Sequence, residues 1–125
     1  MNWIAVAIGG ALGAMARYGV STLLFDASTQ RFPYATLSVN VLGSFLIGIL
    51  FVLIVEKGLL PPEMRSILMV GFLGAFTTFS TFSLDALGLW QNGHLLLALV
   101  YALGTVVLCL AAISLAVWLT RLFLI

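Results

Sequence analysis

The chain has 125 residues, of which 63% are hydrophobic and 7% are charged, and its formal net charge is +1. Soluble domains carry about 25% charged residues, so this composition excludes an ordinary soluble globular protein. No basic or acidic block provides a surface for nucleic acid or for a highly charged protein partner. A bilayer-spanning helix needs about 20 mostly apolar residues. Residues 1–125 accommodate four such helices with short loops, as a single membrane domain.

The first predicted span covers residues 3–25 and lacks the basic flank of a signal peptide, so we interpret it as a retained helix. Gly9 and Gly13 form a small-xxx-small pair, which allows a neighbouring helix to approach closely. Arg17 follows one turn later, although an arginine at a helix centre costs about 2.5–3.5 kcal/mol. Two compatible interpretations remain: it snorkels from near the helix end, or it lies at a pore mouth, where it attracts anions or binds helix-end carbonyls.

The second predicted span covers residues 34–55 and contains one strongly polar side chain, Asn40. Such an asparagine either joins two helices by hydrogen bonds or donates its amide hydrogens to an anion. Ser44 and Gly48 follow at intervals of four residues and share its helix face. This shared face favours a place on a transport pathway.

The third predicted span covers residues 66–90, and residues 71–83 within it hold four phenylalanines and five hydroxyl side chains. Hydroxyl side chains compete for backbone hydrogen bonds, so we expect a break in this helix. Broken membrane helices line cavities or bind ions. The spacing predicts that Phe76, Phe79 and Phe82 share one face. Ring edges carry partial positive charge, so Phe79 and Phe82 either pack in the ordinary way or face a small anion.

Asp85 ends this segment, either as a solvated carboxylate in a vestibule or as the partner of an arginine. The fourth predicted span covers residues 94–122, and Tyr101, Thr105 and Cys109 recur in it every four residues. We interpret Cys109, the only cysteine, as a small packing residue. One histidine, one cysteine and four scattered carboxylates form no nucleophile–base pair and no cluster of metal ligands, so we expect no enzyme.

The positive charges specify the orientation of the chain only weakly. With four spans, both termini lie on the same side as the second loop, and that side holds Lys57, Arg65 and Arg121. The opposite side holds Arg31, with Arg17 near the same boundary. A bias this small predicts that the chain inserts in either orientation.

Three segments carry a resemblance to a known family: GGALGAMARY at residues 9–18, TLSVNVLG at 36–43 and GFLGAFTTFSTFS at 71–83. Their order and spacing, over nearly the whole length, resemble the small bacterial fluoride channels of the Fluc or CrcB family. The resemblance implies an all-α, dual-topology homodimer of antiparallel four-helix subunits with two pores. It also implies a place in the bacterial inner membrane, where fluoride leaves the cell passively.

The resemblance further implies which residues line the fluoride pathway: Asn40, Phe79 and Phe82, followed by a polar track of Tyr101 and Thr105. The next position of that track is Cys109, where the family often has a hydroxyl, and a thiol is a weaker donor. Asp85 stands where the family often has a longer glutamate.

A central sodium ion, structural and not transported, is also implied by the resemblance. The backbone carbonyls of Gly74 and Thr77 from both subunits would hold it. The residues themselves agree with this expectation, because a helix break frees carbonyls and carbonyl oxygens suit hard cations. A buried cation would also offset the cost of bringing an anion into a low-dielectric interior.

Two other classes of protein compete with a fluoride channel. A small multidrug transporter is also a four-helix dimer, but it needs a membrane carboxylate in the first span. No carboxylate precedes Asp26, and Arg17 would repel cationic drugs. A membrane assembly protein without transport activity would explain the glycines but not the hydroxyl-rich segment of the third span.

Overall fold

The computed structural model describes residues 2–25 and 32–125. It contains four helical spans long and apolar enough to cross a membrane: Asn2–Leu24, Tyr34–Glu56, Arg65–Gln91 and Leu95–Phe123. Every predicted span end lies within one residue of the observed end. The protein is therefore a multi-pass, all-helical membrane protein, as the composition indicated. Most of the predicted first loop, including Arg31, lies outside the described residues.

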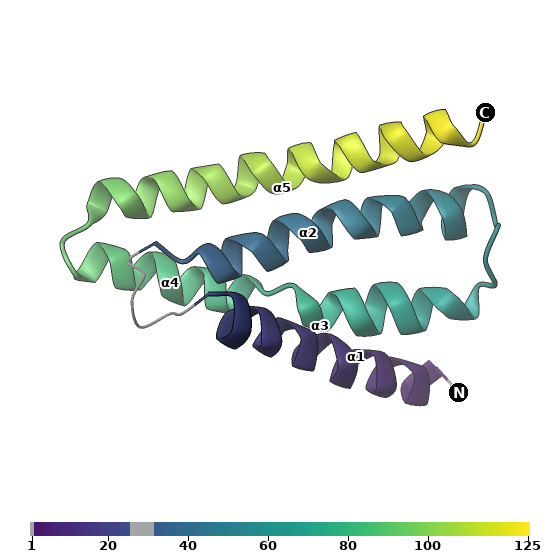
Figure 1. The fold of residues 1–125 in the computed structure, drawn as a ribbon, viewed down its shortest axis with the longest axis horizontal. Helices are drawn as coiled ribbons and strands as arrows, with labels where there is room; N and C mark the ends of the chain where they lie inside the picture. Colours follow the sequence, from purple (N-terminus) through teal and green to yellow (C-terminus); the bar gives the residue numbers. More distant parts are fainter. Residues whose placement is uncertain (1, 26–31) are drawn as a thin grey trace.

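Most spans combine α-helix with a π-helical stretch, in which hydrogen bonds join residues five apart. The first span is α1 (Asn2–Gly19) followed by η1 (Val20–Leu24), and the second is α2 (Tyr34–Leu50) followed by η2 (Phe51–Glu56). The third comprises η3 (Arg65–Leu73), α3 (Gly74–Phe76) and α4 (Phe79–Gln91), and the fourth is the single helix α5 (Leu95–Phe123). Both termini and the connection between η2 and η3 lie at one end of the bundle (Figure 1). This agrees with the expected sidedness.

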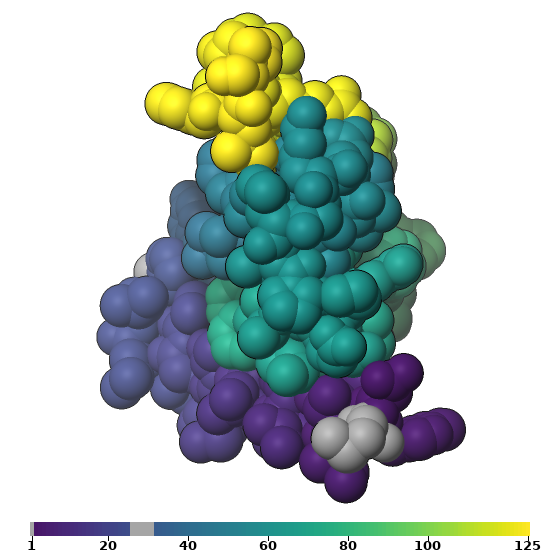
Figure 2. Space-filling model, turned by 90° about the vertical axis from the view of Figure 1, so that its right-hand side faces the viewer, coloured from purple at the N-terminus to yellow at the C-terminus, as the bar shows by residue number. Residues whose placement is uncertain are grey.

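That end is seen face-on in Figure 2, with the C-terminal residues at the top, the N-terminal segment at the bottom and the second connection between them. An ion pair between Glu56 of η2 and Arg121 of α5 joins two spans at this end. The Nε atom of Arg121 donates to Oε1 of Glu56 at 2.9 Å. One of the three cations counted on this side is therefore paired with a carboxylate.

The first and third spans contact each other through their backbones. Gly9 and Gly13 are buried in α1, against η3. A Cβ atom added at Gly71 would lie 3.0 Å from the carbonyl oxygen of Val6 and 3.1 Å from the Cα atom of Gly9. Any side chain at these positions would force the two helices apart. The small-xxx-small interpretation is confirmed, and the neighbour is the third span of the same chain.

The second span packs along α5 in the same manner at one point. A Cβ atom added at Gly48 would lie 2.9 Å from both the Cβ atom of Ala116 and the carbonyl oxygen of Ile113. Gly48 therefore serves the contact between α2 and α5. The four-residue spacing had grouped it with Asn40 and Ser44 on one pathway face, but its local role is helix packing.

Two residues with extended backbone separate α3 from α4 in the third span. Thr77 has φ −86° and ψ 159°, and Thr78 has φ −154° and ψ 125°. The Thr78 hydroxyl then caps α4 by accepting the Thr81 N–H at 3.1 Å. Phe76 packs in one buried cluster, and Phe82 packs in another. The prediction that Phe76 shares a face with Phe79 and Phe82 is wrong, because extended residues end the helical periodicity.

Candidate functional site

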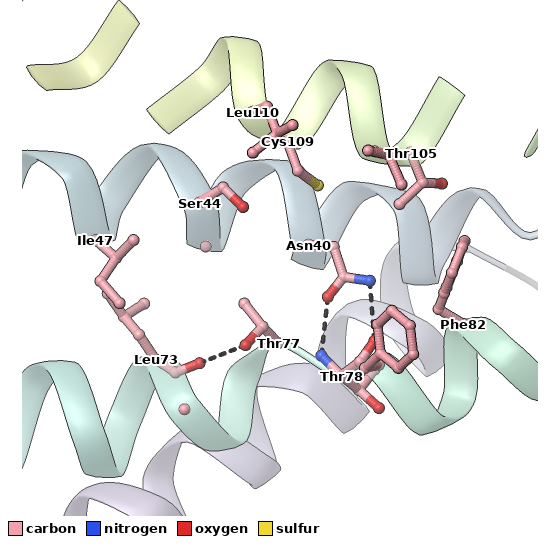
Figure 3. Close-up of a pocket in the computed structure, with 14 residues that line it drawn as sticks. Asn40, Ser44, Ile47, Leu73, Thr77, Thr78, Phe82, Thr105, Cys109 and Leu110 are labelled. Carbon is pink, nitrogen blue, oxygen red and sulfur yellow. Dashed lines mark hydrogen bonds between the residues drawn. The ribbon is translucent and has the colours of Figure 1, made fainter. Parts of the chain in front are cut away.

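A cavity of about 430 Å³ lies where α2, α5 and the extended pair of the third span meet (Figure 3). Its polar lining consists of Asn40, Ser44, Thr77, Thr78, Thr105 and Cys109. Phe79 and Phe82 contribute to an otherwise apolar wall. Among the described residues, this lining includes no charged side chain. The cavity therefore offers an anion only neutral hydrogen-bond donors.

Asn40 is buried and binds the backbone of Thr78 in both directions. Its Oδ1 accepts the Thr78 N–H at 2.8 Å, and its Nδ2 donates to the Thr78 carbonyl oxygen at 3.0 Å (Figure 3). The asparagine thus joins two helices, which was one of its two interpretations. An amide nitrogen carries two hydrogens, so one N–H remains for a ligand. Both interpretations of Asn40 are compatible with this geometry.

Side chains also determine which backbone carbonyls of the third span are bonded. Arg17 Nε donates to the carbonyl of Ala75 at 3.1 Å, and Thr77 Oγ1 donates to that of Leu73 at 2.9 Å. In a continuous helix the Thr78 N–H would bond to the carbonyl of Gly74, but it bonds to Asn40 instead.

The same redirection occurs one turn later. The Thr81 N–H, which would bond to the Thr77 carbonyl in a continuous helix, donates to the Thr78 hydroxyl. The carbonyls of Gly74 and Thr77 therefore lose their usual helical donors. These are the two carbonyls that the family resemblance implies as ligands of a sodium ion.

The two candidate pathway rings are in contact but differ greatly in burial. The ring centroids of Phe79 and Phe82 are 5.4 Å apart, with the planes tilted by 50°. Phe82 is 9% exposed and packs on Tyr101 with centroids 5.1 Å apart, whereas Phe79 is 77% exposed in the single chain. Both rings line the cavity, so the structure brings them together with Asn40.

The polar residues of α5 lie in different surroundings. Thr105 is buried, and its Oγ1 has no hydrogen-bond partner among the described residues. Thr105 contributes to the cavity lining, but its Oγ1 atom is itself shielded, so its hydroxyl reaches a ligand there only after a change of side-chain rotamer. Tyr101 lies outside this lining, and its hydroxyl donates to Oδ2 of Asp85 at 3.2 Å. Cys109 lines the cavity one turn beyond Thr105.

Arg17 and Asp85 border two smaller cavities, of about 310 and 360 Å³ respectively. Thr36 and Thr81 line both of these cavities and so lie between the two charged residues. Thr36 was not among the predicted site residues. It could have been found in the sequence, because it stands four residues before Asn40 and therefore on the same face of α2.

Comparison with known families agrees with the composition and with the motif order. A family model described as CrcB-like protein, Camphor Resistance (CrcB), matches residues 4–117. The chain belongs to the CrcB-like family. The matched range includes every residue of the cavity lining.

Curated members of the CrcB-like family are similar over almost the whole chain. A protein named fluoride-specific ion channel FluC from Saccharophagus degradans is 57% identical over 119 residues, covering 95% of this chain and 89% of the relative. One of the same name from Hahella chejuensis is 55% identical, covering 95% and 94%. A third, from Magnetococcus marinus, is 48% identical over 117 residues, covering 94% and 95%. These relatives are named as ion channels and not as enzymes.

Proposed function

We propose that this protein is a fluoride-specific channel that lets fluoride leave the cell passively, down its electrochemical gradient. Close relatives that carry this name cover nearly the full chain. The observation that carries the proposal is the cavity whose hydrogen-bond donors are neutral. One N–H of Asn40 remains for a ligand there, beside the rings of Phe79 and Phe82, and the buried Thr105 hydroxyl has no partner among the described residues.

Neutral donors suit conduction of a small anion for an energetic reason. Fluoride holds its hydration water strongly, so the cavity must replace that water with hydrogen bonds and ring edges. A fixed positive charge would hold the anion, whereas conduction requires binding weak enough for release. Asn40 donates without such a charge. Arg17 lines a neighbouring cavity, which we assign to the vestibule of the pathway.

The proposal includes an antiparallel homodimer. Phe79, which lines the cavity, is 77% exposed in one chain, so a second subunit would complete the wall on that side. The small positive-inside bias supports insertion in both orientations, which an antiparallel pair requires. Four spans with little buried volume also support a pathway shared between two subunits.

A structural sodium ion at the interrupted third span fits the residues present. The carbonyls of Gly74 and Thr77 are those whose helical donors are redirected to Asn40 and to the Thr78 hydroxyl. Carbonyl oxygens are ligands that hard cations prefer. When bound, the ion supplies positive charge close to an anion pathway. The extended conformation of Thr77 and Thr78 interrupts the helix, so both carbonyls would be free to bind the ion.

The decisive experiment is anion efflux from liposomes that contain the purified protein. We expect rapid fluoride release, followed with a fluoride electrode, and no comparable release of chloride. The absence of fluoride flux from well-folded protein would favour the membrane assembly alternative. The sodium component is tested separately by prolonged exchange into a large organic cation. Loss of flux and of dimer stability is expected, and persistence of both without any bound cation refutes the structural-sodium proposal.

A further inference from the structure

Gly43 lies on α2 opposite the extended pair of the third span. A Cβ atom added at Gly43 would overlap the Cγ2 methyl of Thr77. The next nearest atoms, Cδ2 of Phe76 and Cβ of Thr77, would be at ordinary contact distances of 3.6 and 3.7 Å. The conflict is therefore with a single methyl group. The glycine is needed because of that methyl.

Thr77 has little freedom to move this methyl elsewhere. Its Oγ1 donates to the carbonyl of Leu73 at 2.9 Å (Figure 3). Its backbone N–H donates to the same carbonyl at 3.0 Å. Rotation about χ1 would break the hydroxyl bond. One turn earlier on α2, Asn40 holds Thr78 by two hydrogen bonds. Separating α2 from the third span to make room at Gly43 would stretch both of these bonds.

We infer that Gly43 is a positioning residue: its missing side chain lets α2 contact Thr77, and this contact sets the position of the Thr77 carbonyl. The inference rests on the proposed function in one respect, since the Thr77 carbonyl is a proposed sodium ligand. The contact itself is independent of any transported ion. Gly43→Ala would displace either Thr77 or α2, and overpacking of this kind is destabilising because cores are closely packed.

The test is a double-mutant cycle between Gly43→Ala and Thr77→Ser. Serine keeps the hydroxyl that bonds to Leu73 but lacks the Cγ2 methyl. The effect of Gly43→Ala is therefore measured twice, in the wild-type background and in the Thr77→Ser background. Gly48→Ala is the matched control, because it overpacks the same helix against α5, away from Thr77. Thr77→Ser should not relieve the clash at position 48, because Thr77 is not among the atoms nearest to that position.

Two readouts keep this inference distinct from the proposed function. The first is the melting temperature of the purified, detergent-solubilised protein in sodium chloride and in N-methyl-D-glucamine chloride. The second is fluoride efflux from liposomes. A wild-type protein without efflux contradicts the proposed function, while the melting cycle still decides the role of Gly43.

In the wild-type background we expect Gly43→Ala to lower the melting temperature by more than about 4 °C and to reduce efflux by about tenfold or more. It should also remove the stabilisation by sodium. In the Thr77→Ser background the same substitution should change efflux by less than about twofold. The inference is overturned if Gly43→Ala behaves as wild type, if Thr77→Ser gives no relief, or if Thr77→Ser relieves Gly48→Ala equally.

Discussion

Replacement of Asn40 separates its two functions, joining helices and donating to an anion. Aspartate has the same shape and keeps an oxygen for the Thr78 N–H, now bonded at 2.8 Å. It loses the amide donor that bonds to the Thr78 carbonyl at 3.0 Å, and it also loses the second N–H offered to a ligand. An ionised carboxylate would in addition repel a fluoride ion. Alanine, in contrast, removes both backbone contacts.

The expected magnitudes follow from these contacts. A buried backbone group left without a partner costs about 1–3 kcal/mol. In Asn40→Ala the Thr78 N–H loses its acceptor, so its amide exchange should become about 5- to 150-fold faster. In Asn40→Asp that acceptor remains, and Thr78 should stay protected. Fluoride efflux should be lost in both variants, since neither supplies an amide hydrogen to the cavity.

The assay combines hydrogen exchange of the segment around Thr78 with fluoride efflux from liposomes. Protected Thr78 together with lost efflux in Asn40→Asp would assign transport to the amide hydrogens. Efflux at the wild-type rate from well-folded Asn40→Asp would contradict a pathway position for Asn40. Unchanged Thr78 exchange in Asn40→Ala would contradict its role in holding the extended pair.

Three further predictions concern the rings, the charge near the extended pair and the topology. Phe79→Ile and Phe82→Ile should each reduce fluoride efflux about tenfold in an intact dimer, because ring-edge contacts contribute up to about 1.5 kcal/mol; wild-type efflux from both would remove the rings from the mechanism. Arg17→Gln should lower the melting temperature, because the Ala75 carbonyl loses a charged donor, and Arg17→Lys should restore little of it, since lysine places a methylene group where the donating Nε atom stands; equal melting of wild type and Arg17→Gln would contradict this. Several lysines added within residues 57–64 should lock one orientation and abolish efflux until an oppositely locked copy is present; full efflux from one locked orientation refutes the antiparallel dimer.

The candidate site could be predicted only in part from the sequence. The hydroxyl side chains of residues 71–83 predicted where helical hydrogen bonds would be interrupted, because hydroxyls compete for backbone groups wherever they occur. The sequence did not predict which distant side chains would bind the backbone groups of this segment. Asn40 lies 38 residues from Thr78, and Arg17 lies 58 residues from Ala75. Which side chain reaches which carbonyl depends on how helices distant in sequence pack.

The sequence by itself determined the four spans, their ends and the close approach of α1 to a neighbour. These are local properties, because bilayer thickness and helix rise set the length of an apolar segment, and small residues permit contact with any partner. Only the tertiary structure decided that Phe76 lies apart from Phe79 and Phe82. It alone decided that Gly43 faces Thr77. The physical reason is that two extended residues end the helical periodicity, so the faces of α3 and α4 are no longer related by sequence spacing. Which backbone groups then lack helical partners depends on the side chains packed around them.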